Sequence, residues 1–170
     1  LATAVAAEAI ARDHAPALAS DAFIAGLLHN LGIAVQLHVD ADAMRQLVER
    51  RRALPTEPLR DEEARCIPVG HEECVATVFE AWGFPAALIE AARHHHAPPE
   101  ASDEHRALAA LVNLGVNLGV RSGHAFALEP APVAADAEVL RILGVQPDEL
   151  DTIAQALPAR VEALRSALLD

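Results

Sequence analysis

The stretch AFIAGLLHNLGIAVQLHV, residues 22–39, is the longest apolar run in the chain, and it carries a histidine and an asparagine at its centre. The run approaches the length of a membrane span, but polar side chains interrupt it at His29, Asn30, Gln36 and His38. We therefore predict a buried helix of a helical bundle and no membrane span. Leucines pack in such a helix without polar help, so His29 and Asn30 are candidate site residues.

Outward from this run, apolar residues recur at spacings of three and four, whereas alternating strand patterns with hairpin turns are absent. This periodicity predicts an all-α fold, a compact multi-helix bundle. The expected helices cover residues 1–12, 21–37, 40–52, 69–82, 85–96, 104–121, 134–144 and 147–169. The segment GHAFALEPAPVA, residues 123–134, is too rich in proline and alanine to be helical and is predicted to be a connector.

Capping residues and prolines set the expected helix ends. Ser20 or Asp21 is expected to cap the second helix, and Asp40 the third. Pro55 is expected to lie in a break between helices. Pro158 is expected to end or kink the run before it, because proline lacks the backbone N–H that a helix interior needs.

Composition narrows the classes of partner. The chain has 170 residues, of which 52% are apolar, enough for one compact unit. Its net charge of −12 repels nucleic acid and anionic membranes, so we expect neither as a partner. Two cysteines and no recognisable export signal indicate reduced thiols in the cytoplasm. All thirteen basic residues are arginine, a bias typical of GC-rich bacterial genomes.

Nine histidines are unevenly placed along the chain. His29 lies in a predicted core helix, His71 opens another, and residues 94–96 (HHH) end a third. Imidazole is a common metal ligand, and ligands from separate helices can converge on one ion inside a bundle. The alternative is that these are hydrogen-bonded core histidines, or helix-end histidines that interact with the helix dipole.

The order of the motifs resembles the HDOD domain, a bacterial signalling relative of the HD-domain phosphohydrolases. The matching stretches are AFIAGLLHNLG, VGHEECVATVFEAWGFP, AARHHHAPPE and LAALVNLGVNLG, within residues 1–122. The resemblance implies an all-helical HD-like core in residues 1–122. The amphipathic pattern of the later segments predicts that residues 123–170 form a C-terminal helical extension packed on the same unit. It also implies that helices of the family domain, and a further histidine, precede residue 1.

In catalytic HD relatives, a His-Asp pair stands where this chain has His29 and Asn30, and further metal-binding histidines match His71 and the 94–96 run. An aspartate on the later central helix completes the set, and the metals activate water against a phosphate ester. This sequence departs from that pattern twice, since Asn30 replaces the aspartate and Val116 falls near the second aspartate position. Hard cations prefer anionic oxygen ligands, so both losses weaken a hydrolytic site.

We therefore predict a non-enzymatic signalling domain that acts through protein or ligand contacts, with no catalytic residue and no cofactor. The predicted remnant pocket contains His29, Asn30, His71, His95 and His96. A transition metal such as zinc or nickel, held by His29, His71 and His95, stays as the alternative for this pocket.

Two alternative functions stay open. One is a metal-dependent phosphohydrolase of a nucleotide or cyclic dinucleotide, and the other is a purely structural helical module. The aromatic pair of Trp82 and Phe84 at a helix end is a candidate partner surface, although a packed helix corner is the plainer interpretation. The expected partner is another protein or an adjacent regulatory domain.

Overall fold

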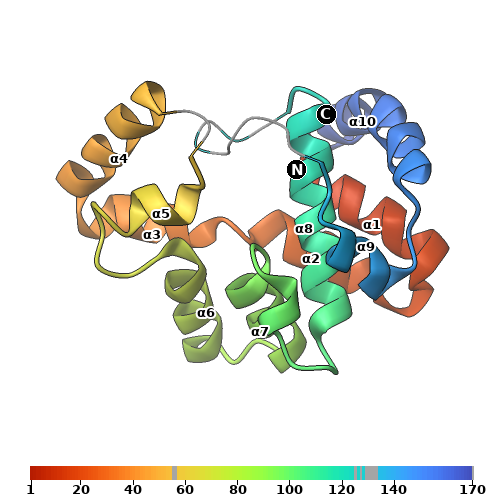
Figure 1. Ribbon diagram of the computed structural model, residues 1–170, viewed down its shortest axis with the longest axis horizontal. Helices are drawn as coiled ribbons and strands as arrows, with labels where there is room; N and C mark the ends of the chain where they lie inside the picture. Colours follow the sequence, from red (N-terminus) through yellow and green to blue (C-terminus); the bar gives the residue numbers. More distant parts are fainter. Residues whose placement is uncertain (55–56, 125, 127, 129–133, 170) are drawn as a thin grey trace.

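The computed structural model describes residues 1–54, 57–124, 126, 128 and 134–169, and the described part is helical with no strand, which confirms the all-α prediction. Figure 1 shows the arrangement of the elements. In chain order they are α1 (Ala2–His14), η1 (Pro16–Leu18), α2 (Ala19–Leu28), α3 (Leu31–Val39), α4 (Ala41–Ala53), α5 (Leu59–Glu63), α6 (His71–Ala81), α7 (Ala86–His94), η2 (Pro98–Glu100), α8 (Arg106–Arg121), α9 (Ala137–Leu143) and α10 (Pro147–Leu169).

Helix α8 is the central element, and it packs against α1, α2, α7, α9 and α10. Its buried face carries a row of leucines with almost no exposed surface, including Leu111, Leu114 and Leu118. Glycines allow the closest helix contacts. A Cβ on Gly26 of α2 would lie 2.9 Å from Cα of Ala4, and one on Gly115 of α8 would lie 2.7 Å from O of Thr3. The backbones of α2 and α8 therefore pack directly against the backbone of α1.

The C-terminal helices share the main core. Val139 of α9 and Leu150, Leu157 and Val161 of α10 are buried in the same hydrophobic cluster as residues of α1 and α8. Within the described residues, 123–170 thus contribute helices that pack onto the N-terminal helices. Of the predicted connector, residues 125, 127 and 129–133 lie outside the described residues, as does Pro55.

The predicted helix 21–37 is two helices, which corrects the sequence interpretation. Helix α2 ends at Leu28 and α3 begins at Leu31, so the chain turns at His29 and Asn30. The expected cap at Ser20 or Asp21 is also wrong, because η1 leads directly into α2 at Ala19 and no side chain caps it.

Two other predictions concern helix ends, at Asp40 and at Pro158. The cap at Asp40 is confirmed, since its carboxylate accepts hydrogen bonds from the backbone N–H groups of Asp42 and Ala43, at 3.1 and 2.9 Å. Pro158 does not end its helix, and α10 continues past it to Leu169. Its position is exposed, so the carbonyl that it leaves unpaired can be hydrated, while buried Leu157 and Val161 hold the helix on either side.

A second, smaller hydrophobic cluster joins α3, α4 and α5. Its buried members include Ile33, Met44, Leu47 and Leu59, and Leu128 inserts from the segment after α8. Figure 1 shows α4 at the edge of the molecule, away from α1 and α8. The molecule therefore has a large core around α8 and a satellite core under α4.

By length and composition alone, residues 16–39 form a stretch of the described chain that is long and apolar enough to cross a membrane, and 33% of that window is buried. Core helices of proteins without any membrane span pass the same test, so this is weak support for a span. The turn at residues 29–30 divides the stretch between α2 and α3.

Candidate functional site

His29 lies at the C-terminal end of α2, where the chain turns into α3. Its backbone N–H still bonds to the carbonyl of Ala25, and its ring Nδ1 lies 2.8 Å from the carbonyl oxygen of Gly26. The side chain is buried, with 7% of its surface exposed. His29 therefore continues the buried face of α2, at helical spacing from buried Ala25 and Gly26.

His71 is the first residue of α6 and is completely buried. Glu63, the last residue of α5, accepts a hydrogen bond from its backbone N–H at 2.8 Å and another from its ring Nδ1 at 2.8 Å. Gln36 of α3 donates a third to Glu63, at 2.5 Å. Glu63 thus replaces a local N-cap and orients the His71 ring.

His95 and His96 follow the last residue of α7. His95 is completely buried, and its Nδ1 lies 2.7 Å from the carbonyl oxygen of Ala92. Its own carbonyl accepts a hydrogen bond from the Asn113 side chain of α8, at 2.7 Å. Pro98 stops the helix soon afterwards and begins η2. The turn between α7 and η2 is thereby fixed against α8.

The four histidines form one cluster. The ring centroids of His29 and His95 are 5.1 Å apart, and those of His71 and His96 are 5.2 Å apart. Nε2 of His71 lies 3.4 Å from Nε2 of His95. Among the described residues, the group whose ligand atoms all lie within 4.8 Å of one another is His71, His95 and His96, with His29 adjacent to it.

The hydrogen-bond partners fix which ring nitrogen carries the proton. Carbonyl oxygens and a carboxylate accept hydrogen bonds and cannot donate them, so His29, His71 and His95 each present an Nδ1–H. In the neutral rings, Nε2 then carries a lone pair. The facing Nε2 atoms of His71 and His95 are both acceptors in this state, so their contact is not a direct hydrogen bond between the rings.

Burial keeps most of these rings neutral. Desolvation lowers the pKa of His29 to about 4 and that of His96 to about 3, and it lowers the pKa of His95 well below its ordinary value. Burial alone would raise the pKa of Glu63, but its hydrogen bond and charge interaction with His71 lower it overall. Glu63 is therefore an anion beside His71, and the rings of His29, His95 and His96 are in the neutral form that binds metals.

Asn30 and Val116 meet at a cavity of about 310 Å³ between α1, α2 and α8, which His29 also lines. Val116, which the resemblance sets near the missing aspartate, thus lines the same cavity as His29 and Asn30. Among the described residues that line this cavity, none carries a carboxylate.

Glu63 was not found from the sequence. The stretch LRDEE reads as a solvated charged segment, yet it forms the short helix α5 and buries Glu63 with 2% of its surface exposed. Its role depends on a contact eight residues along the chain with His71, which no helical spacing indicates. The proline-bounded position of LRDEE, immediately before the histidine-led helix, is the signal that could have found it.

The two aromatic residues of the predicted partner surface lie near each other, with ring centroids 6.3 Å apart, but they differ in exposure. Trp82 is 66% exposed at the end of α6. Phe84 is half-buried and stacks on Phe79, with ring centroids 4.4 Å apart and planes at 7°. Phe84 therefore belongs to the edge of the core, while Trp82 is available at the surface.

Comparison with known proteins assigns the fold to a family. Residues 1–98, more than half of the chain, match the HDOD domain. The chain belongs to the HDOD domain family. The family resemblance predicted from the motif order is thus confirmed, and the match includes His29, His71, His95 and His96.

Two proteins are similar to this HDOD domain. An uncharacterized protein of Treponema pallidum (strain Nichols) is 34% identical over 98 residues, which are 56% of this chain and 18% of that protein. A provisionally assigned signal transduction protein of Marinobacter aquaeolei VT8, with a crystal structure at 2.25 Å resolution, is 24% identical. It has a TM-score of 0.85 and covers 97% of this chain, which spans 36% of it. The chain is thus much shorter than either relative.

Proposed function

We propose that this HDOD domain is a non-enzymatic signal-transduction module that acts through contacts with another protein or an adjacent domain. Membership of the family and the described role of the Marinobacter protein support a signalling domain in general. The proposal keeps the cytoplasmic location and the protein partner predicted from the sequence.

The observation that carries the non-enzymatic part is the composition of the histidine cluster. Within the described residues, the atoms that converge there are imidazole nitrogens, with no carboxylate oxygen among them. Glu63 is the nearby carboxylate, and His71 and Gln36 already take up both of its oxygens. Hydrolytic metal sites of this type hold Mg²⁺ or Mn²⁺ through anionic oxygens, which bind hard cations much better than neutral nitrogens do.

The experiment is a phosphodiester hydrolysis assay with bis(p-nitrophenyl) phosphate and a cyclic dinucleotide, in the presence of Mn²⁺. We expect the wild type and His71→Ala to have the same background rate. The Asn30→Asp variant tests whether the missing carboxylate explains the expected lack of hydrolysis, because it restores one anionic oxygen next to His29. Turnover by the wild type that His71→Ala abolishes would replace the proposal with a phosphohydrolase.

A second candidate function is the binding of a transition metal by the histidine cluster, and one specific observation favours it. Two nitrogens that each bind a tetrahedral zinc at about 2.0–2.1 Å are about 3.3–3.4 Å apart, and Nε2 of His71 and Nε2 of His95 are 3.4 Å apart. The Nδ1–H groups of both rings are held by acceptors, as is usual for histidine ligands. In place of the predicted set of His29, His71 and His95, the ion would be held by His71, His95 and His96, whose ligand atoms all lie within 4.8 Å of one another. It would supply a cross-link between α6 and the end of α7.

Elemental analysis of protein purified without chelator separates the two candidates. A bound-metal function requires about one zinc or nickel per chain, lost in His95→Ala. The simple signalling module requires no bound metal.

A further inference from the structure

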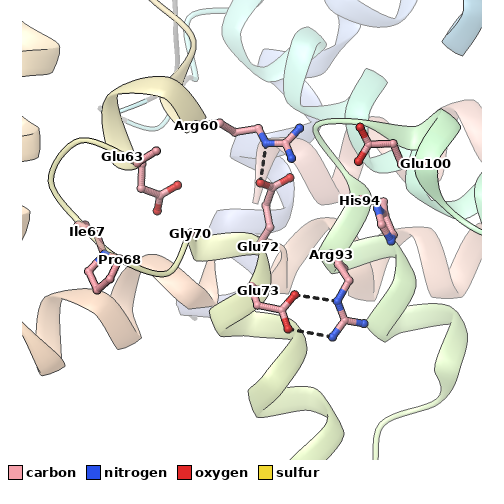
Figure 2. A pocket seen from close by; sticks show the side chains of 11 residues that line it. Arg60, Glu63, Ile67, Pro68, Gly70, Glu72, Glu73, Arg93, His94 and Glu100 are labelled. Atoms are coloured by element: carbon pink, nitrogen blue, oxygen red, sulfur yellow. Dashed lines mark hydrogen bonds and ion pairs between the residues drawn. The ribbon is translucent and has the colours of Figure 1, made fainter.

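A cavity of about 460 Å³ opens between α5, α6, α7 and η2, and charged side chains line it (Figure 2). Nε of Arg60 lies 3.0 Å from Oε2 of Glu72, and Nε of Arg93 lies 2.9 Å from Oε2 of Glu73. Both guanidinium groups are thus paired with carboxylates of the protein itself. A charged ligand would have to displace these pairs, so the arginines of this cavity are not free to bind one.

The cavity of about 310 Å³ between α1, α2 and α8 has a different lining. Among the described residues that line it, none has an acidic or arginine side chain. Its walls are mostly apolar and include Leu27, Val116 and Val120. Its volume is at the lower end of the range of small-molecule sites. Such walls favour a neutral ligand, because a charged one would lose its hydration without gaining a counter-charge.

His29 gives this cavity a hydrogen-bond acceptor. Its Nδ1–H donates to the carbonyl oxygen of Gly26, so the neutral ring carries a lone pair on Nε2. Burial lowers the pKa of His29 to about 4, which keeps the ring neutral at pH 7. Within the described part of the chain, no donor bonds to this Nε2, yet it is not one of the fully buried atoms without a partner. Some of its surface is therefore accessible in the cavity that His29 lines.

This acceptor selects among classes of ligand. A phosphate or carboxylate presents oxygen acceptors that would face the Nε2 lone pair, so anions are disfavoured. A metal ion needs several converging ligand atoms, and within the described residues these belong to His71, His95 and His96. A hydroxyl group can donate directly to Nε2, and a hydrogen bond in apolar surroundings is stronger than one in water. The complementary ligand thus has one donor on a small apolar body.

We propose that this cavity binds a small neutral molecule of the phenol or alcohol class, whose hydroxyl group donates a hydrogen bond to Nε2 of His29 and whose apolar body lies against Leu27, Val116 and Val120. This inference goes beyond the proposed function, because it adds a small-molecule ligand to a domain that acts through protein contacts. Its test measures binding and the test of the proposed function measures hydrolysis, so each can fail without the other.

The test is an NMR titration of the whole chain with p-cresol, followed in two-dimensional amide spectra. We expect saturable shifts at the amides of Leu27, Asn30 and Val120, with a dissociation constant of about 1 mM or lower. The matched ligand is 4-methylanisole, which has the same ring but a methyl ether in place of the hydroxyl group. It should bind about tenfold more weakly, because it has no donor for Nε2.

Two variants change the two halves of the site. His29→Asn keeps a donor near the position of Nδ1 but has no atom at the position of Nε2, so it should weaken p-cresol binding about tenfold. Val116→Phe should do the same by filling part of the cavity, at about tenfold or more. The matched controls are His38→Asn and Val39→Phe at exposed positions of α3, which should leave binding within about twofold.

Three results would overturn the proposal. The first is p-cresol that does not saturate the wild type at about 10 mM. The second is equal binding of 4-methylanisole, which needs no variant and so holds even if His29→Asn does not fold. The third is a set of shifts confined to the amides around Arg60 and Glu72, which would place the ligand in the cavity of Figure 2.

Discussion

At the scale of single residues, Glu63 controls the geometry of the histidine cluster. Its two oxygens accept hydrogen bonds from the ring and backbone of His71 and from Gln36, and its pKa is held low by His71 against the effect of burial. A buried carboxylate of this kind is stable only while its donors stay in place. The orientation of the His71 ring is therefore a property of α5 as much as of α6.

Replacing Glu63 tests this dependence. Glu63→Gln keeps the volume but removes the charge and substitutes a donor for one acceptor, so we expect the free energy of unfolding to fall by about 1–3 kcal/mol. Glu73→Gln is the control, because this α6 carboxylate is half-exposed and should change stability by about 0.5 kcal/mol or less. Urea denaturation measures both. Equal effects of the two substitutions would contradict the role of Glu63.

The buried histidines make stability depend on pH. The pKa of His29 is about 4 in the folded chain and about 6.5 when unfolded, so the unfolded chain takes up the proton first as the pH falls. The contribution is complete above about pH 6.5 and is lost toward pH 4, at a cost of about 3 kcal/mol. The His29→Asn variant, melted with chelator present, should show a shallower loss of stability over this interval. A slope identical to that of the wild type would show that His29 is not buried as described.

At the scale of elements, the contact of α3 with α6 depends on Gly32. A Cβ added there would lie 1.9 Å from the backbone oxygen of His71 and 2.8 Å from its carbonyl carbon. Neither is a flexible group, so the two helices would have to separate, which would move His71 away from Gln36 and His95.

We expect Gly32→Ala to destabilise the fold by about 3 kcal/mol or more. The control is Gly119→Ala in α8, where the nearest atom, Cβ of Ala2, would lie at an ordinary 3.7 Å. That change should be neutral or stabilise by about 0.4–1 kcal/mol, because alanine favours helix more than glycine does. Thermal melting of both variants checks the pair, and a Gly32→Ala variant as stable as the wild type would contradict the close contact.

The elements also show what a sequence can and cannot predict here. Asp40 was found as a cap because its bonds are to residues two and three positions away. The turn at His29 and Asn30 was missed, since an apolar run of this kind predicts one continuous helix. Glu63 was missed because its partners lie on α3 and α6. The grouping of His71 with His95 came from the family resemblance, and the hydrogen bonds that set their ring nitrogens came only from the structure.

At the scale of the whole molecule, two hydrophobic clusters of unequal size stabilise the fold. The main cluster surrounds α8, and the smaller one joins α3, α4, α5 and Leu128. Buried Arg51 of α4 donates to the carbonyl of Leu128 at 3.0 Å, which ties the segment after α8 to the small cluster. The histidine cluster lies between helices that belong to both parts, since Glu63 comes from α5 and His95 follows α7.

We expect the small cluster to open before the whole chain unfolds, because local stability follows buried apolar contact. Hydrogen exchange should therefore be faster at the amides of α4 than at those of α8. Leu47→Ala should accelerate exchange in α4 and leave that of α8 near its wild-type rate. Equal acceleration in both helices would show a single cooperative unit in place of two.

The central claim concerns the charge of the histidine cluster, and a titration with Mn²⁺ followed by electron paramagnetic resonance tests it most directly. Imidazole nitrogens without a carboxylate ligand should leave the signal of free Mn²⁺ unchanged when the protein is added in excess. Asn30→Asp, with one anionic oxygen restored, is the informative comparison. Stoichiometric loss of the Mn²⁺ signal with the wild type, abolished by His71→Ala, would contradict the account.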